Sequence, residues 1–257
     1  MKCEFTEEGI LWIDKIATGV GVILYSPQYK FAAGLHLLRG GGLIDMKGYP
    51  DQRESMTVRS SNLQRVDHGV TGQARIMRNG HKGGVLWFTG LSGAGKSTIA
   101  MQVESRLFQK GYLVYVLDGD NIRSGLNANL GFSPEDRAEN IRRIGEVAAL
   151  FADSGMITIA AFISPYRADR QRARKAAKDA FHEIYVKADV ATCEKRDPKG
   201  LYKRARRGEI AEFTGVSAPY EEPEAAELVV DTSSRSIEDS VRAVVDYVER
   251  NFTLTEP

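Results

Sequence analysis

Residues 90–97 read Gly90-Leu91-Ser92-Gly93-Ala94-Gly95-Lys96-Ser97 and fit the pattern G-x-x-x-x-G-K-[ST]. An apolar run at 85–88 precedes them, and a helical pattern over 97–110 follows. A strand, a glycine loop and a helix start together form a cradle in which backbone N–H groups and a helix N-terminus bind phosphate. The alternative is a glycine-rich turn with a chance lysine, but the flanking strand and helix favour the phosphate loop.

The phosphate loop assigns roles to two of its side chains. Lys96 is expected to reach the β- and γ-phosphates of a nucleotide, and the Ser97 hydroxyl to bind the accompanying Mg²⁺. The predicted cofactor-binding residues are Gly90, Leu91, Ser92, Gly93, Ala94, Gly95, Lys96, Ser97 and Thr98.

The composition is that of a globular chain able to bury a core. It has 257 residues, of which 42% are apolar and 27% charged. With a net charge of +1 the chain has no broad electrostatic field that would attract nucleic acid or a membrane, so we expect neither as a partner. Two cysteines, Cys3 and Cys193, are too few for a disulfide framework or a zinc site, and the first residues lack the pattern of a signal peptide. These features predict a cytoplasmic location.

Residues after about 68 alternate between strand and helix patterns. Strands are predicted at 84–89, 113–118, 157–162, 182–187 and 228–231, with helices at 97–110, 134–153, 167–180 and 236–250. Strands separated by helices form right-handed βαβ units. The predicted fold class is therefore α/β, with a central parallel sheet flanked by helices.

The beginning of the chain has a different pattern. We predict a short β-rich extension over 1–52, a polar linker over 53–67 and a nucleotide-binding domain over 68–257. Val20 to Tyr25 and Phe31 to Leu38 have the pattern of a hairpin around a Pro turn. This hairpin is faintly similar to a piece of the chemotaxis receptor deamidase family, but that family's cysteine would fall near Gly19. A packing extension or a fusion remnant is the favoured interpretation.

Two carboxylates follow the second predicted strand, at Asp118 and Asp120, with Arg123 close behind. Ligands bind at the carboxyl ends of parallel strands, so these groups would lie near the phosphate loop. A carboxylate there can hold Mg²⁺ through water or accept a proton from an attacking hydroxyl. A solvated turn is the alternative, since Asp-Gly is a common turn pair.

Ser164 and Arg167 follow the third predicted strand and would border the same crevice. Ser164 could hydrogen-bond a substrate or accept a phosphoryl group itself. The alternative is a Ser-Pro turn into a helix, with Arg167 merely solvated.

The helix from Pro134 carries Arg137 and Asn140 on one face, where the pair could clamp an anion or form part of a solvated surface. Arg142 and Arg143 are expected to face solvent. Residues 193–222 are dense in charge and poor in core periodicity, which fits either a mobile lid over a nucleotide or an ordinary surface helix and loop.

Several stretches, taken in order, resemble one known family, that of adenylylsulfate kinase (APS kinase). They are Val85–Thr98, Leu117–Arg123, Asn129–Ser133, Asp136–Arg143, Phe162–Arg167, Asp197–Tyr202, and Phe213–Gly215 followed by Tyr220–Pro223. The resemblance runs from about Asn62 to Asn251 and implies a P-loop kinase. It also implies transfer of the γ-phosphoryl group of ATP, with Mg²⁺, to the 3′-hydroxyl of adenosine 5′-phosphosulfate (APS), giving PAPS.

Carried over motif by motif, the resemblance implies an APS site. Its residues are Asp120, Arg123, Phe132, Arg137, Asn140, Ile163 and Ser164, with Lys199, Phe213 and Thr214 closing over the substrate. Phe132 and Phe213 would stack on the adenine. The resemblance makes Ser164 a phosphoserine intermediate. Since in-line transfer needs only positioning and charge neutralisation, a hydroxyl that orients the substrate is the other interpretation.

The implied catalytic residues are Lys96, Asp118, Asp120 and Ser164. We expect a homodimer, with a separate sulfate adenylyltransferase supplying APS. One alternative is a phosphotransferase for another small nucleotide or metabolite. Another is a nucleotide-binding regulatory protein without turnover, although the presence of Lys96, Ser97, Asp118 and Asp120 argues against it.

Overall fold

The structure is a computed structural model, and it divides the chain into two compact units, Met1–Val66 and Asp67–Pro257. It describes residues 62–64, 66 and 68–253, together with strands in the first unit at Lys2–Phe5 (β1), Ile10–Asp14 (β2), Val22–Tyr25 (β3), Leu38–Arg39 (β4) and Gly42–Leu43 (β5).

The first unit contains antiparallel strand pairs. β2 pairs with β1 on one side and with β3 on the other, and β4 pairs with β5. A strand was expected at Val20 to Tyr25, and β3 lies there with β2 as its partner. The expected hairpin partner, Phe31 to Leu38, lies outside the described residues except for Leu38 in β4.

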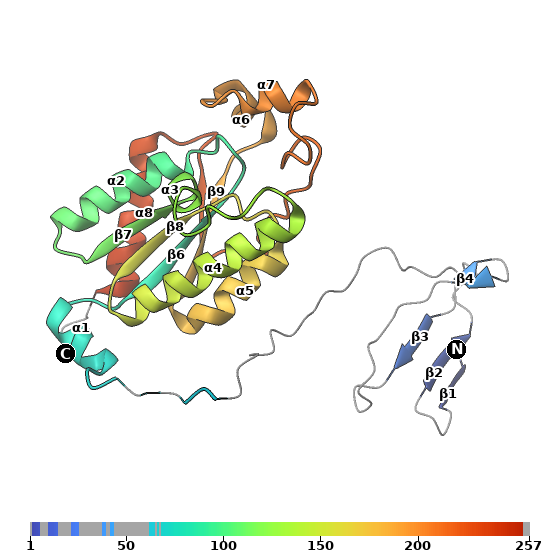
Figure 1. The fold of residues 1–257 in the computed structure, drawn as a ribbon, viewed down its shortest axis with the longest axis horizontal. Coiled ribbons are helices and arrows are strands. Elements are labelled where there is room, and N and C mark those ends of the chain that lie inside the picture. Colours follow the sequence, from blue (N-terminus) through green and yellow to red (C-terminus); the bar gives the residue numbers. More distant parts are fainter. Residues whose placement is uncertain are drawn as a thin grey trace. The chain divides into compact units, whose positions relative to one another are not determined.

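The second unit is built on a five-stranded parallel sheet (Figure 1). Its strand order is β10 (Leu228–Asp231), β9 (Phe181–Lys187), β6 (Gly84–Thr89), β8 (Ile157–Ala161) and β7 (Val114–Asp118). Every neighbouring pair is parallel. The predicted strands are confirmed to within one residue, and so is the α/β fold class.

Long helices cover both faces of this sheet (Figure 1). The four predicted helices are α2 (Lys96–Gln109), α4 (Pro134–Asp153), α5 (Arg167–Ala177) and α8 (Ile237–Phe252), and a 3₁₀ turn at Lys178–Ala180 extends α5. Four shorter helices were not predicted. They are α1 (Gly72–Asn79), α3 (Gly119–Arg123), α6 (Val190–Arg196) and α7 (Leu201–Arg206). No helix among the described residues is long and apolar enough to span a membrane.

The central strand β6 separates two hydrophobic clusters. Leu86 and Phe88 pack in the cluster that contains α2 and α8, whereas Val85 and Trp87 pack in the one that contains α4 and α5. This alternation follows from the two-residue side-chain period of a strand. All four side chains are buried, so β6 is held firmly on both faces and delivers the loop after Thr89 from a fixed position.

Candidate active site

The phosphate loop turns sharply between β6 and α2, and its glycines are required by close packing. Gly90 has a φ of 150°, and a Cβ there would lie 2.3 Å from the carbonyl oxygen of Val186. Gly93 has a φ of 78°, and a Cβ there would lie 2.9 Å from the carbonyl oxygen of Cys193. A side chain at either position would collide with backbone atoms, so the loop keeps its shape only with glycine.

Lys96 begins α2 and folds back over the loop. Its Nζ donates hydrogen bonds to the carbonyl oxygens of Gly90 and Leu91, both at 2.8 Å. Burial lowers the pKa of Lys96 to about 8, because desolvation disfavours the charged ammonium. A bound polyphosphate would favour that charge, so the site suits an anionic ligand.

Ser97 and Asp118 join the phosphate loop to the end of β7. The Ser97 hydroxyl donates to Asp118 Oδ2 at 2.7 Å, while Asp118 Oδ1 accepts from the backbone N–H of Asp120 at 3.1 Å. The second bond caps the short helix α3, which begins directly after Asp118. A hydroxyl and a carboxylate oxygen side by side fit the oxygen preference of Mg²⁺ carried on phosphates.

Asp120 and Lys199 form an ion pair across 79 residues of sequence. Asp120 lies in α3, and Lys199 precedes α7 in the charged segment 193–222. That segment lacks core periodicity in sequence, yet two of its side chains belong to the core. Cys193 and Tyr202 are fully buried, and the Tyr202 hydroxyl donates to the carbonyl oxygen of Ser92 in the phosphate loop at 2.9 Å.

Arg137 ties together two loops that carry predicted substrate residues. Its Nε donates to the Phe132 carbonyl at 2.9 Å, and its other nitrogens donate to the Glu212 carbonyl at 3.0 Å and the Thr214 hydroxyl at 3.4 Å. Arg137 therefore holds the loop before α4 against the loop after α7.

The two predicted stacking rings have different surroundings. Phe132 is 68% exposed, and the guanidinium carbon of Arg123 lies 4.4 Å from its ring centroid. Phe213 is buried and packs edge-on against Tyr202, with their centroids 5.0 Å apart. In this arrangement Phe132 is open to a ligand and Phe213 belongs to the core.

The environment of the two arginines that follow Arg137 in α4 differs from the prediction. Arg142 and Arg143 were expected to face solvent, but both are half-buried and bonded to Glu139. Arg143 also donates to Asn129 at 2.8 Å. Asn140 is buried and accepts a hydrogen bond from Asn127 at 2.9 Å. This face of α4 therefore fixes the preceding loop.

The loop after β8 carries Ile163 and Ser164. The Ile163 carbonyl accepts from the Thr89 hydroxyl at 2.8 Å and from the Gly90 N–H at 3.4 Å. Ser164 is 2% exposed, has a φ of 39°, and its Oγ accepts from the Trp87 indole N–H at 3.1 Å. The Ser164 hydroxyl is therefore held against the core.

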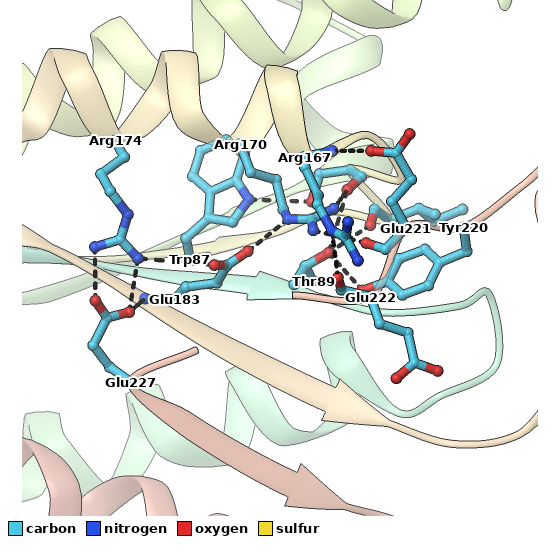
Figure 2. A network of polar contacts seen from close by, with 12 residues as sticks. Trp87, Thr89, Arg167, Arg170, Arg174, Glu183, Tyr220, Glu221, Glu222 and Glu227 are labelled. Atoms are coloured by element: carbon cyan, nitrogen blue, oxygen red, sulfur yellow. Dashed lines mark hydrogen bonds and ion pairs between the residues drawn. The ribbon is translucent and has the colours of Figure 1, made fainter. Parts of the chain in front are cut away.

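A buried ion pair behind this loop was missed by sequence reasoning. Arg170 Nε lies 2.5 Å from Glu183 Oε1, and both side chains are almost fully buried (Figure 2). The available signal was Glu183 itself, since a carboxylate inside a strand covered on both faces requires a cation.

Comparisons with known proteins agree with the motifs. The adenylylsulphate kinase family model matches residues 82–231. The chain is 58% identical to the adenylyl-sulfate kinase of Staphylococcus carnosus over 193 residues, which are 75% of this chain and 97% of that protein.

Two solved structures are similar as well. The APS kinase of Mycobacterium tuberculosis in complex with AMPPNP and APS has a TM-score of 0.63 and 50% identity, covering 65% of this chain and 98% of that chain. The hexameric APS kinase from Thiobacillus denitrificans has a TM-score of 0.51 and 34% identity, covering 67% of this chain and 30% of that one. The chain belongs to the adenylylsulfate kinase family.

Proposed function

We propose that this protein transfers the γ-phosphoryl group of ATP to the 3′-hydroxyl of APS and so forms PAPS. One observation carries the proposal. Two carboxylates in one short segment have partners on different elements, because Asp118 bonds to Ser97 of the phosphate loop while Asp120 pairs with Lys199 before α7. The residues proposed to bind the phosphoryl donor and the phosphoryl acceptor therefore come together at the end of one strand, as phosphoryl transfer requires.

The nucleotide side depends on charge neutralisation. Lys96 neutralises charge on the phosphoryl group as it transfers, and the loop from Gly90 to Thr98 holds the phosphates. Ser97 and Asp118 would hold Mg²⁺, which would supply positive charge to the phosphates of the bound nucleotide.

The acceptor side positions the 3′-hydroxyl. Asp120 accepts its proton, and Ser164 orients the substrate without a covalent step. Phe132 and Phe213 stack on the adenine, which requires Phe213 to turn out of its contact with Tyr202. The proposed APS-binding residues are Asp120, Arg123, Phe132, Arg137, Asn140, Ile163, Ser164, Lys199, Phe213 and Thr214.

The biological setting follows from this activity. The protein works in the cytoplasm as a homodimer, and a separate sulfate adenylyltransferase supplies its APS. Sedimentation equilibrium tests the dimer, and a hexamer like that of the Thiobacillus denitrificans relative would refute it.

A coupled assay of ADP release tests the activity. APS should support turnover, and shikimate, gluconate and nucleosides should not. Lys96→Ala should lower kcat by about 10²-fold or more while the circular dichroism spectrum is unchanged, since the Lys96 ammonium binds carbonyl oxygens of the phosphate loop and belongs to neither hydrophobic cluster. Lys110→Ala, which removes an exposed lysine paired with Glu249, is the matched control. Turnover with another acceptor and none with APS would overturn the proposed substrate.

A further inference from the structure

Arg170 connects three separate parts of the chain through one guanidinium. Its Nε donates to Glu183 Oε1 in β9 at 2.5 Å. One terminal nitrogen donates to the Ser164 carbonyl and the other to the Glu221 carbonyl, both at 2.7 Å. Figure 2 shows Arg170 reaching from α5 toward Glu183 on one side and toward Glu221 on the other.

This arrangement is specific to arginine. The Arg170 side chain is 3% exposed and that of Glu183 is 7% exposed, so both charges are removed from water. Such a pair often stabilises a protein no more than apolar residues of the same shape would. A planar fork with donors pointing in three directions is, however, something that lysine cannot supply. The pair therefore fixes geometry.

The first feature that Arg170 fixes is the backbone of Ser164. A φ of 39° is unusual for a residue other than glycine, and such a conformation persists only where the surroundings hold it. Here Arg170 binds the Ser164 carbonyl and the Trp87 indole binds its Oγ. Both ends of the residue are thereby fixed beside Ile163, on the loop that the proposed function assigns to the acceptor.

The second feature is the segment Tyr220–Glu222, named the strap here. The Glu221 N–H donates to the Pro165 carbonyl at 2.9 Å, and the Tyr220 hydroxyl lies 2.9 Å from the Thr89 hydroxyl. Arg167 donates from its backbone to the Glu221 carboxylate at 2.7 Å and from Nε to the Glu222 carbonyl at 2.8 Å. The strap thus lies along the loop that carries Ser164, and Arg170 binds both.

We propose that Arg170 is a positioning residue for the acceptor substrate, because it holds Ser164 in its left-handed conformation and fastens the strap against it. The inference rests on the proposed function, since it assigns the Ser164 loop to the acceptor. Arg170 acts through Ser164 and the strap. Its loss should therefore impair use of APS and leave ATP binding unchanged.

The test uses a charge-balanced pair of substitutions in the full chain. Arg170→Met with Glu183→Gln removes the donors without leaving an unpaired buried charge. Arg170→Lys keeps the positive charge but lacks the planar guanidinium whose donors point in three directions. Arg174→Gln is the matched control: Arg174 lies one turn further along α5 and 3.8 Å from Glu183, yet its other contacts are to Glu227 and to the carbonyl and ring of Phe181.

The kinetic constants should show an effect on the use of APS and none on the binding of ATP. In the double variant and in Arg170→Lys, KM for APS should rise at least about tenfold and kcat should fall, while Kd for a non-hydrolysable ATP analogue stays within about twofold. Arg174→Gln should keep both constants. A folded double variant with normal KM for APS would overturn the proposal, and so would loss of folding in both Arg170 variants, because Arg170 would then serve the fold alone.

An NMR measurement reports on the conformation of the Ser164 loop and requires no turnover. The chain has two tryptophans, Trp12 and Trp87, and Trp12→Phe assigns the indole N–H resonance of Trp87 in ¹H–¹⁵N spectra. In the Arg170 variants this resonance should move toward its position in Ser164→Ala, whereas Arg174→Gln should not move it. An unmoved resonance would refute the positioning role. Because the shift requires no substrate, it tests Arg170 even if APS is not the acceptor.

Discussion

The ammonium group of Lys199 forms an ion pair with the carboxylate of Asp120, and so links the segment before α7 to α3. Both side chains are largely exposed, and ion pairs of that kind contribute little stability. A substrate can therefore displace Lys199 at small cost. The Asp120 carboxylate would then be free to accept a proton from the 3′-hydroxyl.

Asp120→Asn should lower kcat by about 10²-fold or more and leave KM for ATP within about twofold, because the carboxylate acts on the acceptor in the transition state. Initial rates of ADP release at saturating APS and varied ATP measure this split. Asp179→Asn, at an exposed position in the turn after α5, is the control. A rise only in the Mg²⁺ or ATP requirement would show that Asp120 positions the metal.

Nucleotide binding near pH 8 should take up protons. The pKa of Lys96 is about 8 in the free protein because of burial, so a substantial part of the amine is neutral there. Phosphates favour the charged form and raise this pKa, so binding recruits the missing proton. The uptake should fade below pH 7, where the amine is already charged.

Titration calorimetry in two buffers of different ionisation enthalpy measures this uptake. Lys96→Met is the control, and it should show less uptake than the wild-type chain. Equal uptake in both proteins would mean that another group binds the proton.

Ser164→Ala should keep PAPS synthesis within about tenfold of the wild-type rate. The hydroxyl is buried against Trp87 and accepts one hydrogen bond from it, a contact typically worth about 1 kcal/mol. Chromatographic quantification of PAPS measures the rate. An inactive but folded variant, together with phosphoserine trapped at this position in the wild-type chain, would establish covalent transfer instead.

Deleting residues 1–52 should leave a folded kinase with kcat close to that of the full chain, since every residue proposed to bind ATP or APS lies after residue 84. The truncation should change solubility or oligomeric state more than kcat, because a small set of strands is only marginally stable unless it packs on another surface. Size-exclusion chromatography and the ADP-release assay test both points. A correctly sized but inactive fragment would show that the division into 1–52, 53–67 and 68–257 is wrong.

The long elements of the fold, whose apolar residues repeat with a clear period, were predictable from sequence. Helices α4 and α8 begin where Ser133 and Ser236 accept hydrogen bonds from the backbone three residues on, as their cap patterns indicate. The short helices α6 and α7 were not predicted, because fewer than two turns give no clear period. The burial of Tyr202 in α7 depends on its contact with Ser92, which lies 110 residues away.

The candidate site was predictable where a motif sets the geometry locally, as at Lys96 and Ser97. It was not predictable where a side chain serves a distant partner. The spacing of Arg137 left an anion clamp and a solvated surface open, and it did not indicate that its donors bind loop oxygens at Phe132 and Glu212. Nothing near Arg170 in sequence indicates that it binds both Ser164 and Glu221.

The carbonyl oxygen of Ile163 accepts hydrogen bonds from both Thr89 and Gly90, so the loop that carries Ser164 is bonded to the start of the phosphate loop through one atom. A shift of either loop changes the geometry of the other. Any coupling that this contact carries between the two substrates is reciprocal: whatever factor ATP applies to the affinity for APS, APS must apply to the affinity for ATP.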